Sequence, residues 1–242
     1  MNELSCFLAE LLGTAILILL GNGVVANVKL ERSGMQNGNS VHITIGWGLA
    51  VMLPAFIFGA TSGAHFNPVL TLALAADGSL AWNLVGWYVS GQMLGGALGA
   101  VLVWLLYYKH FLATEDGAVK RACFCTTPSI PCVPSNFLAE FVGTFVLVFA
   151  IKGIAQTGKL PDGVNNFFVF GIITSIGMSL GGLTGYAINP ARDLGPRLMY
   201  ALLPLGKKDS ANWNYAWIPV VAPILGALAA VGLYKVFHWP TM

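Results

Sequence analysis

The chain has 242 residues, of which 56% are hydrophobic and only 9% are charged, and its net charge is +2 at pH 7. Soluble domains carry about 25% charged residues, so this composition excludes an ordinary soluble protein and favours one that spans a membrane. The near-neutral net charge gives no sign of the basic surface that nucleic-acid binding requires.

Six apolar stretches have about the 20 residues that a transmembrane helix needs. Glu3 and no basic residue precede the first, so we interpret it as a retained span rather than a cleavable signal peptide. The predicted spans are 6–28, 41–60, 82–108, 136–155, 164–182 and 214–237. The polar breaks are 29–40, 109–135, 157–163 and 204–213. The longest break divides the chain into a first half, 1–108, a central loop, 109–135, and a second half, 136–242.

An Asn-Pro pair occurs once in each half, within SGAHFNPVLT and TGYAINPARD. Asn is a strong N-cap, and Pro fits the first helical position because no N–H is needed there. A single Asn-Pro pair is usually a turn, but two copies in matching places favour helices that begin at Asn67-Pro68 and Asn189-Pro190. These helices, near 67–77 and 189–203, are too short to cross a bilayer. Broken helices at membrane depth line cavities, which predicts a transport site at the midplane.

The two halves repeat each other in sequence. FLAELLGT, residues 7–14, matches FLAEFVGT, residues 137–144, and both halves contain three spans and one half-helix. Because three is odd, the second half must enter from the opposite side of the membrane. The predicted fold is therefore an all-α membrane protein with six transmembrane helices, two re-entrant half-helices and an inverted three-plus-three repeat.

The two half-helices are expected to meet by their N-termini at mid-depth. Each N-terminus carries about half a positive charge, so the pair forms a barrier to cations and protons. Asn67 and Asn189 are expected to turn amide N–H groups into the lumen, and the segments 62–66 and 184–188, predicted as extended, to supply carbonyl acceptors. Such groups replace water around a polar solute, since an unpaired buried hydroxyl costs about 2–7 kcal/mol.

These motifs, over nearly the whole chain, resemble the major intrinsic protein (aquaporin) family, and within it the aquaglyceroporins or glycerol facilitators. The resemblance implies a selectivity filter of Trp47, Gly177, Tyr186 and Arg192. Water-selective relatives usually have a histidine where this chain has Gly177, which is expected to leave room for a carbon backbone. Trp47 and Tyr186 would pack the C–H face of a polyol, although many glycerol facilitators have Phe at the second position. Arg192 would donate to hydroxyls and repel cations.

Four further residues, Val69, Glu10, Glu140 and His65, have expected roles near the half-helices. Val69 follows the first Asn-Pro pair and is expected to add bulk on the lumen side. Glu10 and Glu140 are ionisable groups inside spans, which would suit a proton relay. The resemblance instead implies that both accept backbone N–H bonds from an irregular loop, and we favour that role. His65 is expected to be a hydrogen-bonded support for its loop rather than a gate.

The cysteines of the central loop carry no clear signal. Cys123, Cys125 and Cys132 do not form a convincing zinc pattern, and no histidine is close. Both a disulfide and free thiols without a function stay open.

The resemblance implies a multi-pass protein of the cell membrane, with both termini in the cytoplasm and a homotetrameric assembly in the lipid bilayer. The basic residues would then lie mostly outside, against the positive-inside rule. These residues are Lys29, Arg32, Lys120, Arg121, Lys207 and Lys208.

The leading hypothesis is a passive channel for glycerol and similar small neutral solutes, with water. Alternatives within the channel class are a water-dominated pore and a channel for undissociated small acids such as lactic acid or for dihydroxyacetone. An alternative of another class is a proton-coupled carrier in which Glu10 or Glu140 titrates. The filter arginine and the lack of an acidic chain along the predicted lumen disfavour the carrier. No nucleophile–base pair or metal cluster is visible in the sequence, so we expect no enzyme activity, cofactor or metal.

Overall fold

The computed structural model describes residues 2–155 and 163–237, and regular secondary structure in these ranges is entirely α-helical. Six described helices are long and apolar enough to cross a membrane, as predicted. They are α1 (Glu3–Lys29), α2 (Ser40–Ser62), α4 (Trp82–Leu106), α7 (Val133–Ile154), α8 (Val164–Thr184) and α10 (Ile218–Val236). The predicted break at 157–163 lies, except for Gly163, outside the described residues.

The two short helices also occur where the Asn-Pro pairs predicted them. They are α3 (Pro68–Asp77) and α9 (Pro190–Leu202), and each has Asn as N-cap and Pro in its first turn. The asparagine satisfies N–H groups that the helix leaves without partners, which is why a helix can start within apolar surroundings.

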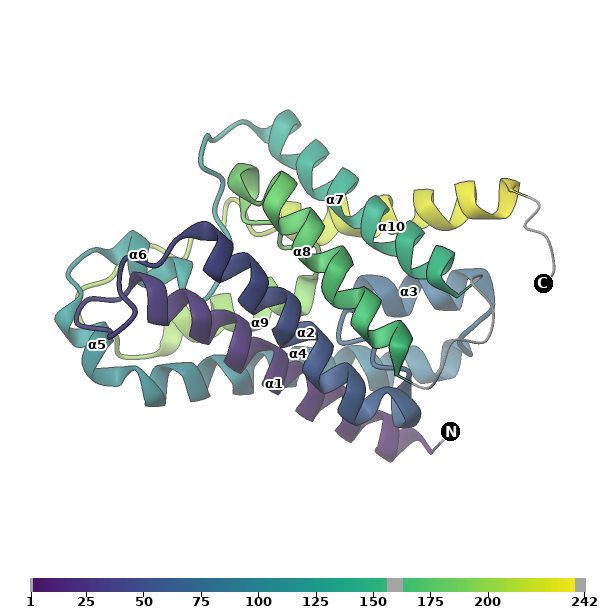
Figure 1. The fold of residues 1–242 in the computed structure, drawn as a ribbon, viewed down its shortest axis with the longest axis horizontal. Helices are drawn as coiled ribbons and strands as arrows, with labels where there is room; N and C mark the ends of the chain where they lie inside the picture. The colour runs from purple at the N-terminus through teal and green to yellow at the C-terminus, as the bar shows by residue number, and fades with distance from the viewer. Residues whose placement is uncertain (1, 156–162, 238–242) are drawn as a thin grey trace.

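The helix contacts follow the inverted repeat. In the first half α1 packs against α2 and α4, and in the second half α7 packs against α8 and α10. Each half-helix reaches across to the last span of the other half, because α3 contacts α10 and α9 contacts α4. In Figure 1, α1 begins at the end of the molecule where α10 finishes. The two half-helices lie between the two groups of spans.

Three glycines of α4 bring it close to α1. A Cβ at Gly91, Gly95 or Gly99 would collide with a backbone carbonyl oxygen of α1. The spacing of four places all three glycines on one helix face, so the two backbones approach closely along several turns.

The central loop contains more structure than the predicted break at 109–135. Two short helices, α5 (Tyr108–Ala113) and α6 (Gly117–Ala122), precede its extended part. They were not predicted because each has only six residues, far fewer than the about 20 apolar residues by which a span is recognised. Phe124 packs its ring 5.7 Å from that of Tyr200 in α9, so the loop is anchored to the second half-helix.

Two lysines near the central loop, Lys120 and Lys208, hold loops together. Lys120 donates to the carbonyls of Leu205 and Lys207, both at 2.8 Å. Lys208 donates to three carbonyl oxygens at the end of α9. These contacts give the basic residues a structural reason to be present whatever their orientation in the membrane.

All four cysteines are free thiols. Cys123 and Cys125 are buried, whereas Cys132 is exposed. Burial raises the pKa of the Cys125 thiol to about 12, so the group stays protonated at neutral pH. The structure therefore favours free thiols over the disulfide alternative, and Cys125 is unreactive because the thiolate is the reactive form.

Candidate functional site

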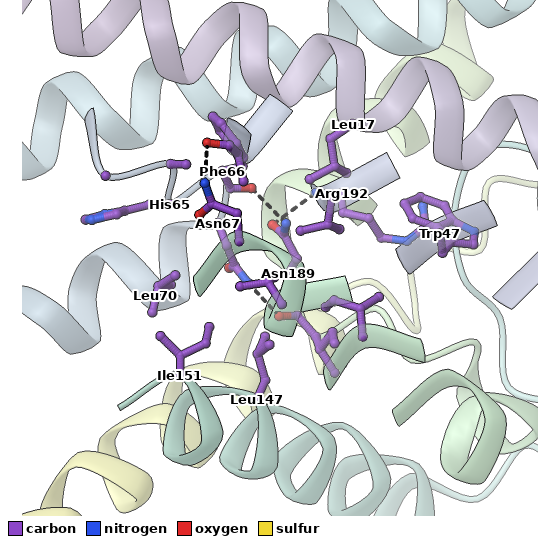
Figure 2. A pocket seen from close by; sticks show the side chains of 18 of the residues that line it. Leu17, Trp47, His65, Phe66, Asn67, Leu70, Leu147, Ile151, Asn189 and Arg192 are labelled. Atoms are coloured by element: carbon purple, nitrogen blue, oxygen red, sulfur yellow. Dashed lines mark hydrogen bonds between the residues drawn. The ribbon is translucent and has the colours of Figure 1, made fainter. Parts of the chain in front are cut away.

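The centre of the site is a reciprocal contact between the two half-helix N-termini (Figure 2). The Asn67 side chain accepts from the N–H of Val69, and the Asn189 side chain accepts from the N–H of Ala191. Both helices therefore begin at the middle of the molecule, with their positive ends facing each other.

The amide N–H groups of the two asparagines are partly used within the protein. Asn67 Nδ2 donates to the carbonyl of Ile188 at 2.8 Å, and Asn189 Nδ2 donates to the carbonyl of Phe66 at 2.8 Å. The prediction that both amides face the lumen is therefore incomplete, since one N–H of each links it to the opposite loop. An amide has two N–H donors, so one remains at each asparagine. Both residues line a cavity, where that donor is available to a solute.

The loops before the half-helices differ from the extended backbone predicted for 62–66 and 184–188. Several of their residues adopt the left-handed region, which non-glycine residues rarely occupy. They are Gly63, Ala64 and Phe66 in the first loop and Gly185, Tyr186 and Ile188 in the second. Each strained non-glycine residue costs about 1–3 kcal/mol and persists only when its surroundings hold it.

Glu10 holds the first loop from α1. Its carboxylate is fully buried and accepts four hydrogen bonds of 2.6–3.0 Å. The donors are the Ser62 hydroxyl, the backbone N–H groups of His65 and Phe66, and the Gln92 side chain.

Glu140 holds the second loop in the corresponding way from α7. Its buried carboxylate accepts from the Thr184 hydroxyl at 2.6 Å and from the N–H groups of Ala187 and Ile188 at 3.0 and 2.8 Å. Charge-assisted bonds of this kind are stronger than neutral ones, so the carboxylates can offset the backbone strain of both loops.

We expect Glu140→Gln to destabilise the protein by about 1–3 kcal/mol, because an amide presents a donor where a backbone N–H needs an acceptor. Glu10→Gln should cost less. Its neighbour Gln92 has an oxygen without a hydrogen-bond partner, which could turn to accept from the new amide. Thermal unfolding in detergent measures both effects. A stable Glu140→Gln protein with an altered pH dependence of transport would instead support the relay hypothesis.

Two cavities lie on either side of three of the predicted filter residues. The inner cavity, of about 310 Å³, contains the two asparagines, and the outer cavity, of about 730 Å³, opens between α2, α8 and the central loop. Trp47, Tyr186 and Arg192 line both. A molecule passing from one cavity to the other must therefore cross the space between these side chains.

The inner cavity has one apolar and one polar wall. The spans and α3 contribute the apolar side chains Leu17, Val51, Leu70, Leu147, Ile151, Val169 and Ile173. The two loops and the asparagines contribute polar groups. Figure 2 shows Leu70, Ile151 and Leu147 around the asparagine pair, with Arg192 and Trp47 beyond Asn189. This arrangement suits a molecule that has one hydroxyl-rich side and one C–H side.

Arg192 is held firmly within this junction. Its Nη1 donates to the Asn22 side-chain oxygen at 3.1 Å and to the Phe124 carbonyl at 3.2 Å. Its guanidinium carbon lies 4.0 Å from the centroid of the Trp47 ring, so the arginine covers part of the indole surface predicted for a solute. Within the described part of the chain, Nε and Nη2 donate no hydrogen bond. Arg192 therefore keeps three N–H donors for a passing molecule.

Gly177 is placed differently from its predicted role. A Cβ at this position would lie 2.6 Å from Thr44 Cγ2 and 2.8 Å from Tyr186 Cζ. The space that the glycine leaves is thus filled by the Tyr186 ring rather than left open to the lumen, and Gly177 lines only the outer cavity. The sequence could not reveal which side chain occupies that space.

Two other predictions concern the first half-helix. Val69 is fully buried, packs in a core cluster with Val148 and Ala227, and lines neither cavity, so the prediction that it adds bulk to the lumen is wrong. His65 contacts the Thr71 hydroxyl at 3.1 Å through Nδ1, and its ring lies 4.7 Å from that of Tyr88.

The sequence reasoning missed Asn22, which bonds Arg192 from behind. Asn22 is a buried polar residue inside an apolar span, and that isolated polarity was the available signal. Asp193 and Arg197 form a fully buried ion pair that also bonds Thr126 of the central loop. Asp193 is thus bonded to Arg197 and Thr126, and no carboxylate of the described residues forms an ion pair with Arg192.

Comparisons with known proteins agree with this geometry. A profile of the family described as "Major intrinsic protein" matches residues 1–234. The chain is 47% identical over 232 residues to a probable glycerol uptake facilitator protein of Thermotoga maritima, covering 96% of this chain and 99% of the relative. It is 48% identical over 223 residues to the glycerol uptake facilitator protein of Bacillus subtilis, covering 92% and 81%.

The fold gives the same result. The X-ray structure of the aquaglyceroporin from Plasmodium falciparum matches with a TM-score of 0.85 and 29% identity, over 97% of this chain and 96% of that one. Family match, close relatives and fold each cover nearly the whole chain. The chain therefore belongs to the major intrinsic protein family.

Proposed function

We propose that the chain is a passive transmembrane channel for glycerol and similar small uncharged solutes, and also for water. The observation that carries the proposal is the junction between two cavities at Trp47, Tyr186 and Arg192. At this junction three free N–H donors of Arg192 face the path between the cavities, and one wall of the inner cavity is apolar. In this proposal these residues form the selectivity filter together with Gly177, which seats Tyr186.

Glycerol suits such a path because it has hydroxyls on one side of a short carbon chain. The donors of Arg192 and of the two asparagines would replace part of its water shell, and the apolar wall would contact its C–H groups. This replacement limits the cost of dehydration, which is about 2–7 kcal/mol for an unpaired hydroxyl. The names of the relatives, glycerol uptake facilitators, support the same solute.

Stopped-flow light scattering of proteoliposomes tests this function. In a glycerol gradient we expect shrinkage followed by reswelling much faster than in protein-free vesicles. In a sorbitol gradient we expect shrinkage without comparable reswelling. A pH gradient should not drive accumulation of glycerol. Reswelling no faster than in protein-free vesicles would overturn the proposal, and proton-driven accumulation would replace the channel by a carrier.

The carrier alternative has less support. Glu10 and Glu140 are fully buried, are bound to the loops and line neither cavity. We therefore propose that they and His65 support the loops, and that Pro68 and Pro190 with their asparagines fix the pore midpoint.

Tyr186→Phe tests whether the hydroxyl of this residue bonds a solute. The Tyr186 hydroxyl is buried beside Thr44 and makes no hydrogen bond of good geometry to the described residues. We expect glycerol flux to stay within about twofold, because the ring still packs on Gly177. Flux of dihydroxyacetone and of undissociated lactic acid should also stay within about twofold, because a hydroxyl without exposed surface does not reach a passing solute. A selective loss for these two solutes, by the few-fold to tenfold that corresponds to about 0.5–1.5 kcal/mol, would mean that the hydroxyl bonds them. An equal change for all three solutes would mean that Tyr186 contributes only shape.

We also propose a homotetramer in the cell membrane with both termini cytoplasmic. Exposed apolar side chains on the spans, such as Leu49, Leu53, Leu94 and Leu98, suit contact with lipid or neighbouring subunits. In this orientation the exposed Cys132 faces outward. A membrane-impermeant maleimide should then label intact cells, and Cys132→Ser should abolish the labelling. Labelling only after permeabilisation would reverse the orientation.

A further inference from the structure

Asn22 lies at the same level of α1 as the junction between the two cavities, yet it lines neither of them. Its side chain is fully buried, in a helix that is otherwise strongly apolar. A buried amide in such surroundings is costly unless it is hydrogen-bonded, so its contacts show what it stabilises.

The two ends of the Asn22 amide bind two groups that also bind each other. Its oxygen accepts from Arg192 Nη1 at 3.1 Å, and its Nδ2 donates to the Phe124 carbonyl at 3.2 Å. The same carbonyl accepts from Arg192 Nη1 at 3.2 Å. The three groups therefore form a closed triangle in which each contacts the other two.

Gly21, the preceding residue of α1, makes room for the Trp47 side chain. A Cβ at Gly21 would collide with the ring of Trp47. Gly21 thus lets the indole lie against α1, while Asn22 holds the guanidinium that stacks on it at 4.0 Å. Two successive residues of one span fix both partners of the Trp47–Arg192 pair.

We propose that Asn22 is a positioning residue that fixes the orientation of Arg192, and through it the choice of solute and the exclusion of cations. This inference rests on the proposed channel function. An amide suits the task because it accepts from the arginine and donates to the carbonyl at once. It also carries no charge, so the full positive charge of Arg192 stays in the pore.

Two variants separate these properties. Asn22→Leu removes both hydrogen bonds, so Arg192 gains freedom and the erythritol-to-glycerol flux ratio should change by about two- to tenfold, as for one lost hydrogen bond. Asn22→Asp is nearly isosteric and places a carboxylate on Arg192. It should raise the proton and potassium leak of vesicles by about tenfold, because the neighbouring charge offsets the arginine.

Asn27→Leu is the matched control. Asn27 lies on the same helix and also makes hydrogen bonds, to Met35 and Ser33, but it does not contact Arg192. It should leave both the flux ratio and the leak unchanged. A second control is the Arg192→Val background, in which Asn22→Leu should produce no further change in the flux ratio, because the group that it positions is gone.

The result that overturns the inference is a wild-type flux ratio and leak in folded Asn22 variants. Lower stability alone, with ratio and leak unchanged, would likewise assign Asn22 a purely structural role. If Asn22→Leu does not fold, the leak of Asn22→Asp decides the matter. Absence of glycerol flux in the wild type would overturn the proposed function itself, and that outcome is measured separately.

Discussion

In Gly177→His, glycerol flux should fall at least about tenfold while water flux falls less than about threefold, which corresponds to a barrier raised by roughly 1.4 kcal/mol or more for glycerol. A Cβ at this position already meets the Tyr186 ring and Thr44 below 3.0 Å. The imidazole must therefore displace Tyr186 toward the path between the cavities. Water is small enough to pass the narrowed junction, whereas the carbon chain of glycerol is not. Stopped-flow measurements of both fluxes on one vesicle preparation test this result.

Gly182→His is the matched control for this substitution. Gly182 belongs to the same helix and also lines the outer cavity, but a Cβ there has no neighbour within 4 Å. It should leave the ratio of glycerol to water flux unchanged. In Gly177→His, additional replacement of Tyr186 by Ala should restore part of the glycerol flux, because it removes the displaced ring. Equal losses of glycerol and water flux in a folded Gly177→His protein would remove Gly177 from the filter region.

The architecture could be predicted from the sequence because its signals are local. A span is recognised by its apolar length, and a half-helix by Asn-Pro at its start. The repeat of FLAE and Asn-Pro shows two halves of three spans each, which predicts that the second half is inverted in the membrane. The structure has all six spans within a few residues of their predicted ends. Among the described helices, α5 and α6 alone were not predicted, because six residues are too few to form an apolar window.

The site was harder to predict because its chemistry depends on contacts between distant segments. The resemblance supplied Gly177 and Tyr186, but no local pattern shows that the tyrosine ring fills the space beside the glycine. Likewise, the caps at Asn67 and Asn189 follow from sequence, whereas their bonds to carbonyls more than 100 residues away do not. Val69 was assigned to the lumen because its side-chain direction could not be known before α3 was packed against α10.

Arg192→Val should raise the proton and potassium leak by at least about tenfold and loosen the choice among polyols. The arginine is a buried positive charge that forms no ion pair with a described carboxylate. Two unit charges 4 Å apart interact by about 4 kcal/mol at an effective dielectric constant of 20. Its loss removes most of this repulsion of cations at the junction. The half-helix N-termini still face each other below it, so part of the barrier remains. Erythritol flux should rise relative to glycerol, because the guanidinium no longer narrows the space beside Trp47.

Arg121→Val and Arg192→Lys show which property of the side chain is responsible. Arg121 is partly exposed and lines only the outer cavity. Its loss should change neither leak nor polyol choice by more than about twofold, because solvent and salt screen its charge. Lysine keeps the charge at position 192 but lacks the flat guanidinium that stacks on Trp47 and the Nε and Nη2 donors that face the path. Arg192→Lys should therefore keep cation exclusion near the wild-type value and still alter the polyol ratio. If the leak of folded Arg192→Val equals that of the wild type, the barrier lies wholly at the half-helix N-termini and Arg192 acts only through its hydrogen-bond donors.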